Sequence, residues 1–373
     1  MKLAIISHTE HYLTEDGVIV GWGPTVNEIN HLLEVYDEIT HLAMLYKGDP
    51  PQSAHPYKSD KITFVPIPAV GGKSFLSKLN IIWNAPQTLM LISKHLKTAN
   101  NFQFRAPTGI GVYLIPYLIL FSKKKGWFKY AGNWNQKNAP IGYGLQRWFL
   151  KHQKRTVTIN GSWEGQPKHC LTFENPCLTA QDLSEGEFVV SNKRLNLKLS
   201  FCFVGRLERE KGVERIIKAF SALTIEEKEK IDQVYFVGDG NEADYFKDIA
   251  AQSGIRFNFK GYLSRNSVFD IYKRSHFFLL PSLASEGFPK VIAEAMNFGC
   301  VPIVSNVSAI TQYVTDGING YVVDPVTIEN LSNHLRLVIS IKKEAYRELI
   351  SSNNMVQKFS YGYYNHRIKN DIF

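Results

Sequence analysis

The feature that most constrains the fold is a regular alternation of short apolar runs and amphipathic helical segments in the second half of the sequence. After the first run, Val213, Ile216, Ile217 and Phe220 recur at helical spacing and form one apolar face. Short buried strands that alternate with such helices form βαβ units, so we predict a doubly wound parallel sheet. The expected strands are residues 199–207, 233–237, 255–260, 276–280, 301–305 and 320–323, and the expected helices 213–223, 242–251, 266–274, 289–298 and 308–315.

The first half begins in the same way and predicts a second α/β domain. A loop with Gly17, Gly21 and Gly23 follows the first strand, and Thr25 and Glu28 then have the spacing of a helix capping box. The expected strands are residues 3–7, 39–45, 62–66, 127–130, 156–160 and 169–173. With 373 residues, we expect a first domain over 1–180, a polar linker over 181–198, a second domain over 199–353 and a C-terminal helix over 354–373 that packs back on the first domain.

Charge is distributed unevenly along the chain. The whole sequence has 43 Lys and Arg against 34 Asp and Glu, a net charge of +9. Residues 61–155 contain 15 of the basic residues, and no acidic residue lies between Asp60 and Glu164. The rest of the chain therefore has a net charge of −6. A segment this cationic indicates an anionic partner for the first domain.

No segment of the sequence predicts a membrane-spanning helix. The first apolar run covers only residues 3–6, and the run 111–121 is far short of about 20 residues and contains Pro116. We expect a cytoplasmic protein, either soluble or peripheral on the inner face of the cell membrane. The four cysteines have no CxxC spacing, which indicates buried free thiols in a reducing compartment. They are Cys170, Cys177, Cys202 and Cys300.

Two loops that follow expected strands have the residues best suited to chemistry, because ligands of an open parallel sheet bind beyond the carboxyl ends of its strands. Residues 204–212 read VGRLEREKG. Arg206 and Lys211 lie there near a helix N-terminus, which is a preferred site for phosphate. A solvated charged turn is the alternative for this loop taken alone.

The second loop, residues 281–296, reads PSLASEGFPKVIAEAM. Pro289 suits the first turn of a helix, so Glu286 stands just before the helix and Glu294 within it. Gly287 leaves the helix N-terminal amides uncovered, and a phosphate ligand with hydroxyl groups can dock between the two carboxylates. In the alternative, Glu286 caps the helix and Glu294 is a surface residue, although apolar residues flank Glu294.

Together, these segments resemble the paired signature of glycosyltransferase family 4. GRLEREKG at 205–212, SEGFPKVIAEAM at 285–296 and DGINGYVVDP at 316–325 carry the resemblance, and Glu286 and Glu294 have the family's spacing of seven intervening residues. The resemblance implies a retaining enzyme that uses a nucleotide sugar. It also implies the α/β class and the GT-B fold, in which two Rossmann-like doubly wound domains face a cleft. It covers roughly residues 199–325, whereas the first half is similar only loosely.

The resemblance implies a role for each matching residue. Arg206 and Lys211 would bind the donor diphosphate and stabilise it as it leaves. Glu294 would accept hydrogen bonds from the ribose hydroxyls, and Glu286 would hold sugar hydroxyls, so that Arg206, Lys211 and Glu286 form the catalytic set. The other donor-binding residues that it implies are Gly205, Gly238, Gly287, Phe288 and Pro289.

Charge gives a physical account of this chemistry. Breaking the bond between the anomeric carbon and phosphate leaves a more negative diphosphate, so two cations and a helix N-terminus stabilise the transition state. We therefore expect no metal and no cofactor, with the nucleotide-diphosphate sugar as donor substrate; the sequence has no Asp-x-Asp pair of the metal-holding kind. An inverting enzyme needs a base to deprotonate the acceptor hydroxyl. The first domain has no carboxylate from 61 to 163, which agrees with a retaining reaction.

The acceptor side is less defined. Candidates are Gly21 and Gly23, before the first helix, and Asn133, after a strand. The family often has a His near this last position, where this sequence has Gly-Asn-Trp. An ordinary turn asparagine is the alternative for Asn133.

Several partners fit residues 61–155. Lys123, Lys124 and Lys125 follow the apolar residues 112–121 and precede the aromatic residues of 127–130, which is typical of a surface that meets anionic lipid. A polyanionic or lipid-linked acceptor would use the same charges, and a buried helix with scattered solvated lysines is the structural alternative. Nucleic acid is disfavoured because no recognised nucleic-acid module is present. We favour contact with an anionic membrane surface.

The sequence thus predicts a hexosyltransferase-type enzyme that transfers a sugar to a hydroxyl of a glycan or lipid-linked glycan in polysaccharide, capsule or lipopolysaccharide biosynthesis. One alternative is a nucleotide-sugar epimerase of the same fold, which would need acid and base residues in the first domain. The other is a non-catalytic nucleotide-sugar-binding or membrane-associated protein.

Overall fold

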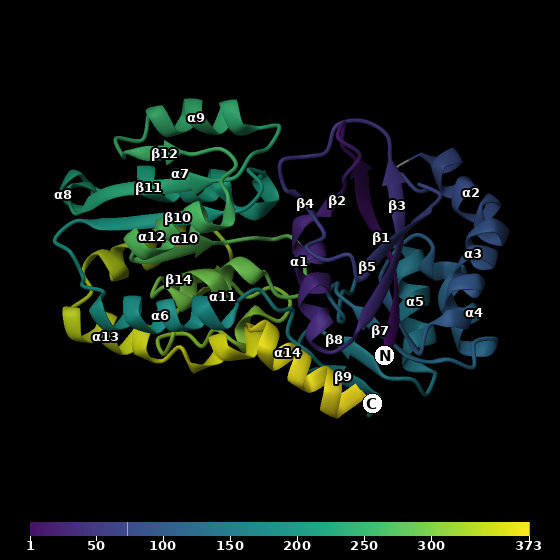
Figure 1. Cartoon of the computed structure of the whole chain (residues 1–373). Coiled ribbons are helices and arrows are strands. Elements are labelled where there is room, and N and C mark those ends of the chain that lie inside the picture. Colours follow the sequence, from purple (N-terminus) through teal and green to yellow (C-terminus); the bar gives the residue numbers. More distant parts are fainter. Residues whose placement is uncertain (73, 373) are drawn as a thin grey trace. The chain divides into compact units, whose positions relative to one another are not determined.

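The computed structural model describes residues 1–72 and 74–372. The chain forms two compact units, named unit 1 (Met1–Asn175 with Tyr361–Phe373) and unit 2 (Pro176–Ser360) (Figure 1). Lys73, in the cationic segment, and Phe373, at the end of the expected C-terminal helix, lie outside the described residues.

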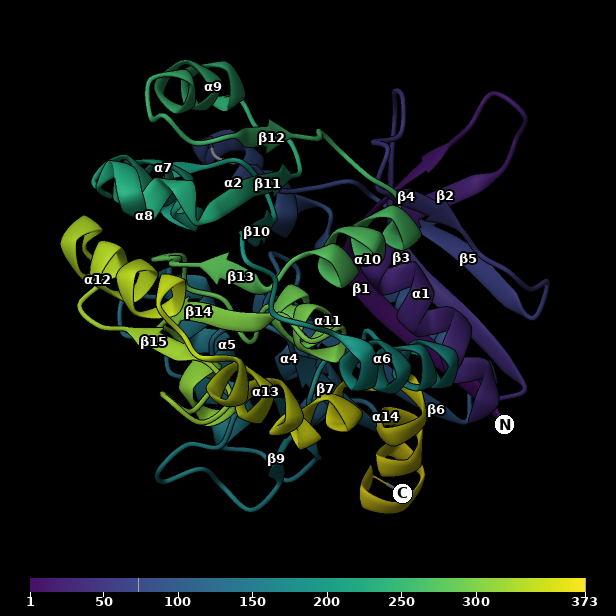
Figure 2. The same ribbon diagram turned by 90° about the vertical axis from the view of Figure 1, so that its left-hand side faces the viewer.

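Unit 2 consists of a parallel sheet with helices on both of its faces (Figures 1 and 2). Its strands are β10 (Leu199–Val204), β11 (Ile231–Val237), β12 (Phe257–Phe259), β13 (Phe277–Leu280), β14 (Val301–Ser305) and β15 (Tyr321–Val323). Its helices are α6 (Ala180–Asn192), α7 (Val213–Ser221), α8 (Ile225–Glu229), α9 (Ala243–Ala251), α10 (Arg265–Arg274), α11 (Lys290–Asn297), α12 (Ile328–Ile339) and α13 (Lys343–Ser351). Each predicted strand of this half is present, and the central strands β10 and β13 are apolar runs that are covered from both sides.

Two expectations for this half were wrong. Residues 308–315 form only a 3-10 turn, Ile310–Gln312, because Ser308 has a φ of 58° that a helix does not allow. The expected linker, 181–198, is mostly the helix α6. Its N-cap is Thr179, whose side chain accepts from the backbone N–H of Asp182, and Asp182 completes a capping box. The many polar residues of this helix give its sequence the composition of a linker.

The strand order of unit 2 is β12-β11-β10-β13-β14-β15, and all neighbouring strands are parallel. From β10 the chain proceeds outward through β11 to β12, and from β13 it proceeds the other way through β14 to β15. The boundary between β10 and β13 is therefore the topological switch point, where loops diverge and leave room for a ligand.

Unit 1 also contains a mainly parallel sheet. Its strands are β1 (Lys2–Leu13), β2 (Ile19–Trp22), β3 (Glu38–Tyr46), β4 (Ala54–Pro56), β5 (Ile62–Ile67), β6 (Asn101–Ala106), β7 (Lys125–Tyr130), β8 (Val157–Ile159) and β9 (Cys170–Thr172). Its helices are α1 (Gly23–His31), α2 (Phe75–Trp83), α3 (Ala85–Thr98), α4 (Gly111–Leu120), α5 (Ile141–Lys151) and α14 (Tyr361–Arg367). The parallel order is β5-β3-β1-β6-β7-β8-β9, with a switch point between β1 and β6.

The expected glycine loop of unit 1 is instead a hairpin. β1 continues to Leu13 and pairs antiparallel with β2, and Gly17 turns the chain with a φ of 78°. The capping box expected at Thr25 and Glu28 is absent, because α1 begins two residues earlier, at Gly23. Both expected cap residues are inside the helix.

Glu28 has a different role, in a buried charge cluster. Its carboxylate oxygen Oε1 lies 2.8 Å from Arg105 Nη2 and 2.6 Å from Lys129 Nζ, and it accepts a hydrogen bond from the Tyr364 hydroxyl at 3.1 Å. Tyr364 lies on α14, so the C-terminal segment is held in unit 1 by this cluster. Burial of these charges is tolerated because they are paired and hydrogen-bonded.

The sequence analysis expected the apolar residues of 112–121 and the aromatic residues of 127–130 to form a membrane-facing surface. Many of these side chains are buried instead. α4 buries Leu114, Ile115 and Leu118 in the core of unit 1, which leaves mainly its C-terminal end exposed. The aromatic residues of β7 are buried as well, including Trp127 at 0% exposure. A central strand of a covered sheet cannot supply an aromatic belt. Within the described residues, no helix is long and apolar enough to cross a membrane.

The four cysteines are free thiols with buried side chains, as predicted.

Candidate functional site

Both loops singled out in the sequence lie at the switch point of unit 2. Residues 205–212 follow β10 and lead into α7, and residues 281–289 follow β13 and lead into α11. Since β10 and β13 are neighbours in the sheet, the two loops start side by side at its carboxyl edge. The site is thus assembled from segments about 75 residues apart in the chain.

Glycines allow the loops at this edge to approach one another closely. A Cβ at Gly238, in the loop after β11, would lie 2.0 Å from the carbonyl oxygen of Gly205. A Cβ at Gly212 would lie 2.5 Å from the carbonyl oxygen of Pro281, and Gly212 has a φ of 93°. These positions exclude larger residues, so the three loops share one close-packed backbone platform.

Hydrogen bonds connect the same loops. The backbone N–H of Leu283 donates to the carbonyl of Glu210 at 2.8 Å, and the backbone N–H of Leu207 donates to the carbonyl of Asp239 at 2.9 Å. The guanidinium of Arg215, on α7, donates to the carbonyl of Pro281 at 3.0 Å. The loops are therefore held together largely through their backbones.

Lys211 and Glu286 form an ion pair across the switch point. The Lys211 side chain is 12% exposed, and that of Glu286 is 37% exposed. Burial lowers the pKa of Lys211 from its usual value of 10.5, and the charge of Arg206 adds to the decrease. The site thus presents a desolvated ammonium group whose counter-ion is a more accessible carboxylate.

Arg206 provides a second cation at the mouth of the site. Its side chain is 72% exposed and its Nη1 lies 2.8 Å from Glu208 Oε1. An exposed pair of this kind is weak and exchanges readily for a stronger anion such as phosphate.

Glu294 lies on α11 and is half-buried. Within the described residues, its carboxylate has no hydrogen bond and no ion pair. Desolvation raises its pKa from the usual 4.5, and the charges of Arg265 and Lys290 oppose that increase. A half-buried carboxylate without a hydrogen-bond donor among the described residues can accept hydrogen bonds from the hydroxyl groups of a ligand.

The residues between the two glutamates have mixed environments. Gly287 and Phe288 are buried, and the Phe288 ring packs between Tyr313 and Phe359, with ring centroids 4.9 and 4.6 Å away. The ring is therefore part of the core of unit 2. Pro289 is the N-cap residue of α11 rather than its first residue. The first amides of α11 have no partner within the helix.

The predicted acceptor-side glycines lie in tight packing positions in unit 1. A Cβ at Gly21 would lie 2.3 Å from the His11 ring, and a Cβ at Gly23 would lie 2.7 Å from the carbonyl of Ser53. The side-chain oxygen of Asn133 accepts from the backbone N–H of Asn135 at 3.0 Å, which is a local turn. These contacts give each residue a structural role, and an acceptor role for them stays a prediction.

Sequence reasoning missed two cations near Glu294. Lys290 starts α11, and Arg265 starts α10, with its Nη2 2.7 Å from Asp182 Oδ2. The order of the strands brings α10 to α11, and no local motif signals that contact. Within the described residues, no group of three or more His, Cys, Asp or Glu could hold a metal ion.

Comparison with known proteins agrees with this geometry. Residues 188–354 match the family model described as glycosyl transferases group 1, a range that contains both loops and α11. The chain is similar to the lipopolysaccharide 1,2-N-acetylglucosaminetransferase of Salmonella typhimurium, with 27% identity over 42% of this chain and 46% of that protein. It is also similar to the capsular polysaccharide biosynthesis glycosyltransferase CapH of Staphylococcus aureus, with 33% identity over 35% of this chain and 38% of that protein.

The matched part spans less than half of the length of these curated relatives. Solved structures match along the whole chain. Anabaena HepE in complex with UDP covers 100% of this chain and 99% of its own, with a TM-score of 0.70 and 14% identity. Sucrose-phosphate synthase from Thermosynechococcus elongatus covers 99% and 97%, with a TM-score of 0.72 and 15% identity.

These matches and the two Rossmann-like sheets define the fold class as GT-B, as the sequence predicted.

Proposed function

We propose that this protein is a glycosyltransferase that moves a sugar from a nucleoside diphosphate sugar to a hydroxyl group of a cell-surface glycan. The observation that carries the proposal is the Lys211–Glu286 ion pair at the switch point of unit 2, with the half-buried Glu294 carboxylate on the adjoining helix. Names of relatives from lipopolysaccharide and capsule biosynthesis support the glycan as acceptor class. UDP in a structure of the same fold supports a nucleotide donor.

In the proposed reaction, Lys211 and Arg206 bind the diphosphate, and the N-terminal amides of α11 add a favourable dipole. Lys211 exchanges Glu286 for phosphate, and the freed carboxylate then accepts hydrogen bonds from the sugar. Glu294 accepts hydrogen bonds from the ribose. The bond from the anomeric carbon to the phosphate oxygen breaks, and the negative charge that develops on the leaving diphosphate strengthens its attraction to both cations.

We further propose that the anomeric configuration is retained. The acceptor oxygen bonds to the anomeric carbon on the face that the diphosphate leaves, and the acceptor proton goes to the leaving phosphate oxygen. No carboxylate between residues 61 and 163 is available as a base in unit 1, which favours this route. Nuclear magnetic resonance of the first-formed product tests it, since an inverted anomeric signal would contradict retention.

We also propose that the two cations make a divalent metal unnecessary. Transfer in excess EDTA should then equal transfer in the presence of Mg²⁺. A loss of activity that Mg²⁺ or Mn²⁺ restores would contradict this part of the proposal.

A thermal-shift panel tests donor binding. The intact chain is melted with UDP-, GDP-, ADP- and dTDP-sugars, because a ligand that binds the folded state raises its melting temperature. We expect one nucleotide class to stabilise the wild type and Lys218→Ala but not Lys211→Ala. Lys218 is a matched control, since it forms an exposed ion pair with Glu214 on the same segment. Equal shifts in all three proteins would contradict the site.

Finally, we propose that residues 61–155 contact an anionic membrane surface, which makes the protein peripheral on the inner face of the cell membrane. The absence of acidic residues between Asp60 and Glu164 supports this contact.

A further inference from the structure

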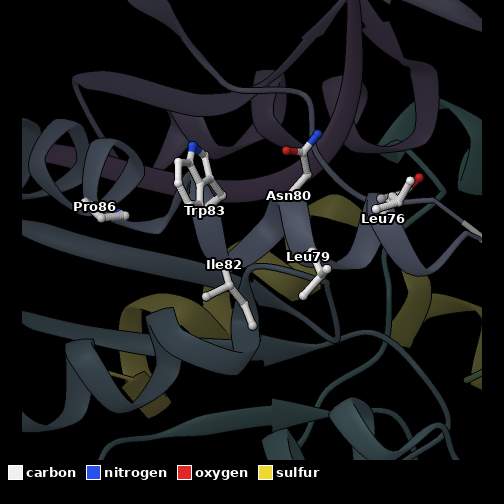
Figure 3. A pocket seen from close by; sticks show the side chains of 7 residues that line it. Leu76, Leu79, Asn80, Ile82, Trp83 and Pro86 are labelled. Atoms are coloured by element: carbon white, nitrogen blue, oxygen red, sulfur yellow. The ribbon is translucent and has the colours of Figure 1, made fainter.

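Helix α2 in unit 1 exposes apolar side chains that the sequence analysis did not single out. The exposed fractions are 76% for Leu76, 47% for Leu79, 68% for Ile82 and 85% for Trp83. Figure 3 shows these side chains projecting from one short helix. Soluble surfaces seldom expose so many large apolar residues together, so the patch indicates a partner.

The periodicity of α2 shows that its apolar face points outward. Leu76, Leu79 and Trp83 are spaced three and four residues apart and therefore share one side of the helix. Ile81 is on the other side and packs against the core of unit 1. The helix thus has apolar residues on both its inner and its outer face, and water contacts the outer one.

The helix that carries the patch lies at the carboxyl edge of the unit 1 sheet. A Cβ at Gly109, in the loop after β6, would lie 2.8 Å from Ile81 Cδ1 and 3.4 Å from His8 Cε1. His8 is in β1, so α2 covers the carboxyl end of β6 beside β1, which is the switch point of this unit. A ligand of unit 1 would be expected at the same edge.

A hollow on this surface has the size needed for hydrocarbon. Its volume is about 820 Å³, and its lining comes from α2 and from Pro86 at the start of α3. The hollow is open to solvent, so it suits contact with several methylene groups at a lipid surface.

The charge of the segment that contains α2 favours one type of apolar partner. The segment that contains α2 has basic residues and no acidic residue from Lys61 to Trp163. Lys94 and Lys97 on α3 follow the patch in the chain. An apolar protein surface gains nothing from such a charge, whereas a bilayer with anionic headgroups is attracted to it and accepts Trp and Leu side chains at its interface.

We propose that α2 inserts its outer face, Leu76, Leu79 and Trp83, into the interface of an anionic lipid bilayer. This contact would present the switch point of unit 1 to a lipid-linked acceptor. Only the presentation of unit 1 to a lipid-linked acceptor rests on the proposed function. Binding to lipid does not require sugar transfer.

Co-sedimentation of the intact protein with vesicles tests the insertion. Vesicles of phosphatidylcholine with phosphatidylglycerol are compared with vesicles of phosphatidylcholine alone, at low salt. We expect the wild type to prefer the anionic vesicles, and the combined variant Leu76→Ser, Leu79→Ser, Trp83→Ser to bind at least tenfold less. The control Phe188→Ser, Leu197→Ser changes two residues of unit 2 that are 71% and 95% exposed and lie outside residues 61–155, and it should bind within about twofold of the wild type.

Three outcomes would overturn the insertion: equal binding of wild type and triple variant, an equal loss in the unit 2 control, or no preference for anionic lipid. A lipid-free dimer in sedimentation velocity that the triple variant abolishes would also overturn it, because a second copy would then cover α2. All substitutions are at exposed positions, so unchanged melting temperatures will show that the variants fold.

A parallel assay separates this inference from the proposed function. Donor-dependent transfer to a water-soluble acceptor should be the same in the triple variant and the wild type. If neither protein transfers sugar with any donor, yet vesicle binding depends on α2, the proposed function fails and the membrane contact stands.

Discussion

The ammonium group of Lys211 and the carboxylate of Glu286 are paired across the boundary between β10 and β13 in the ligand-free protein. The pair neutralises a mostly buried cation that would otherwise be costly. In the proposed function a diphosphate replaces the carboxylate. The two residues are therefore expected to affect binding and turnover differently.

Glu286→Gln tests this exchange. It removes the competitor for Lys211, so affinity for the free nucleoside diphosphate should be equal to or higher than that of the wild type. Transfer should decrease at least tenfold, because the amide is a poorer acceptor for sugar hydroxyls, a difference of about 1.4 kcal/mol in the barrier. Titration calorimetry measures the affinity for the nucleoside diphosphate, and the rate of product formation measures the turnover. Glu185→Gln, at an exposed pair with Lys273, is the control and should change neither.

Glu294→Gln is expected to separate stability from binding. Desolvation raises the pKa of Glu294, so its charge destabilises the ligand-free fold at pH 7. The neutral amide should leave the melting temperature unchanged or higher, while stabilisation by the nucleotide sugar disappears. A decrease in the ligand-free melting temperature together with a normal nucleotide shift would show that the carboxylate is structural.

Gly238→Ala should disrupt the platform beneath the site. The new Cβ would lie 2.0 Å from the Gly205 carbonyl oxygen, and Gly238 has a φ of 126°, so the loops after β10 and β11 must separate. We expect a loss of about 2 kcal/mol or more in the free energy of unfolding and weaker nucleotide binding. Gly144→Ala, on α5 with open space around it, is the control and should be neutral or slightly stabilising.

The buried histidines of unit 1 should make stability depend on pH. Burial lowers the pKa of His8 from 6.5 to about 4. The unfolded chain then binds more protons between these values, so stability is complete above pH 6.5 and decreases as the pH falls toward 4. His8 should account for about 2 kcal/mol of lost stability between pH 7 and pH 5. Urea unfolding of the wild type and of His8→Asn measures this contribution, and identical pH profiles would contradict it.

Much of unit 2 was predictable from sequence because its strands are continuous apolar runs and its helices are strongly amphipathic. Both features are local, and so is the pairing of a glycine-rich loop with a strand end. Lys211 and Glu286 could therefore be proposed together, although their contact depends on the β10–β13 adjacency.

Unit 1 was less predictable because its features depend on distant partners. Glu28 matched a capping box, yet its side chain is buried and forms ion pairs with Arg105 and Lys129 on neighbouring strands. β6 was missed because its polar residues, such as Gln103, are buried by tertiary packing rather than by local pattern. The outer face of α2 was missed because its apolar residues are exposed, whereas apolar residues are usually buried. The sequence alone does not show that Trp83 lies at the surface.

The most direct test of the central claim is donor cleavage by the intact protein with the nucleotide sugar found in the thermal panel. Release of nucleoside diphosphate, in the presence of an acceptor glycan, is compared among wild type, Lys211→Ala and Lys218→Ala. We expect release by the wild type and Lys218→Ala, and a rate at least tenfold lower for Lys211→Ala. Equal rates in the wild type and Lys211→Ala would contradict this claim.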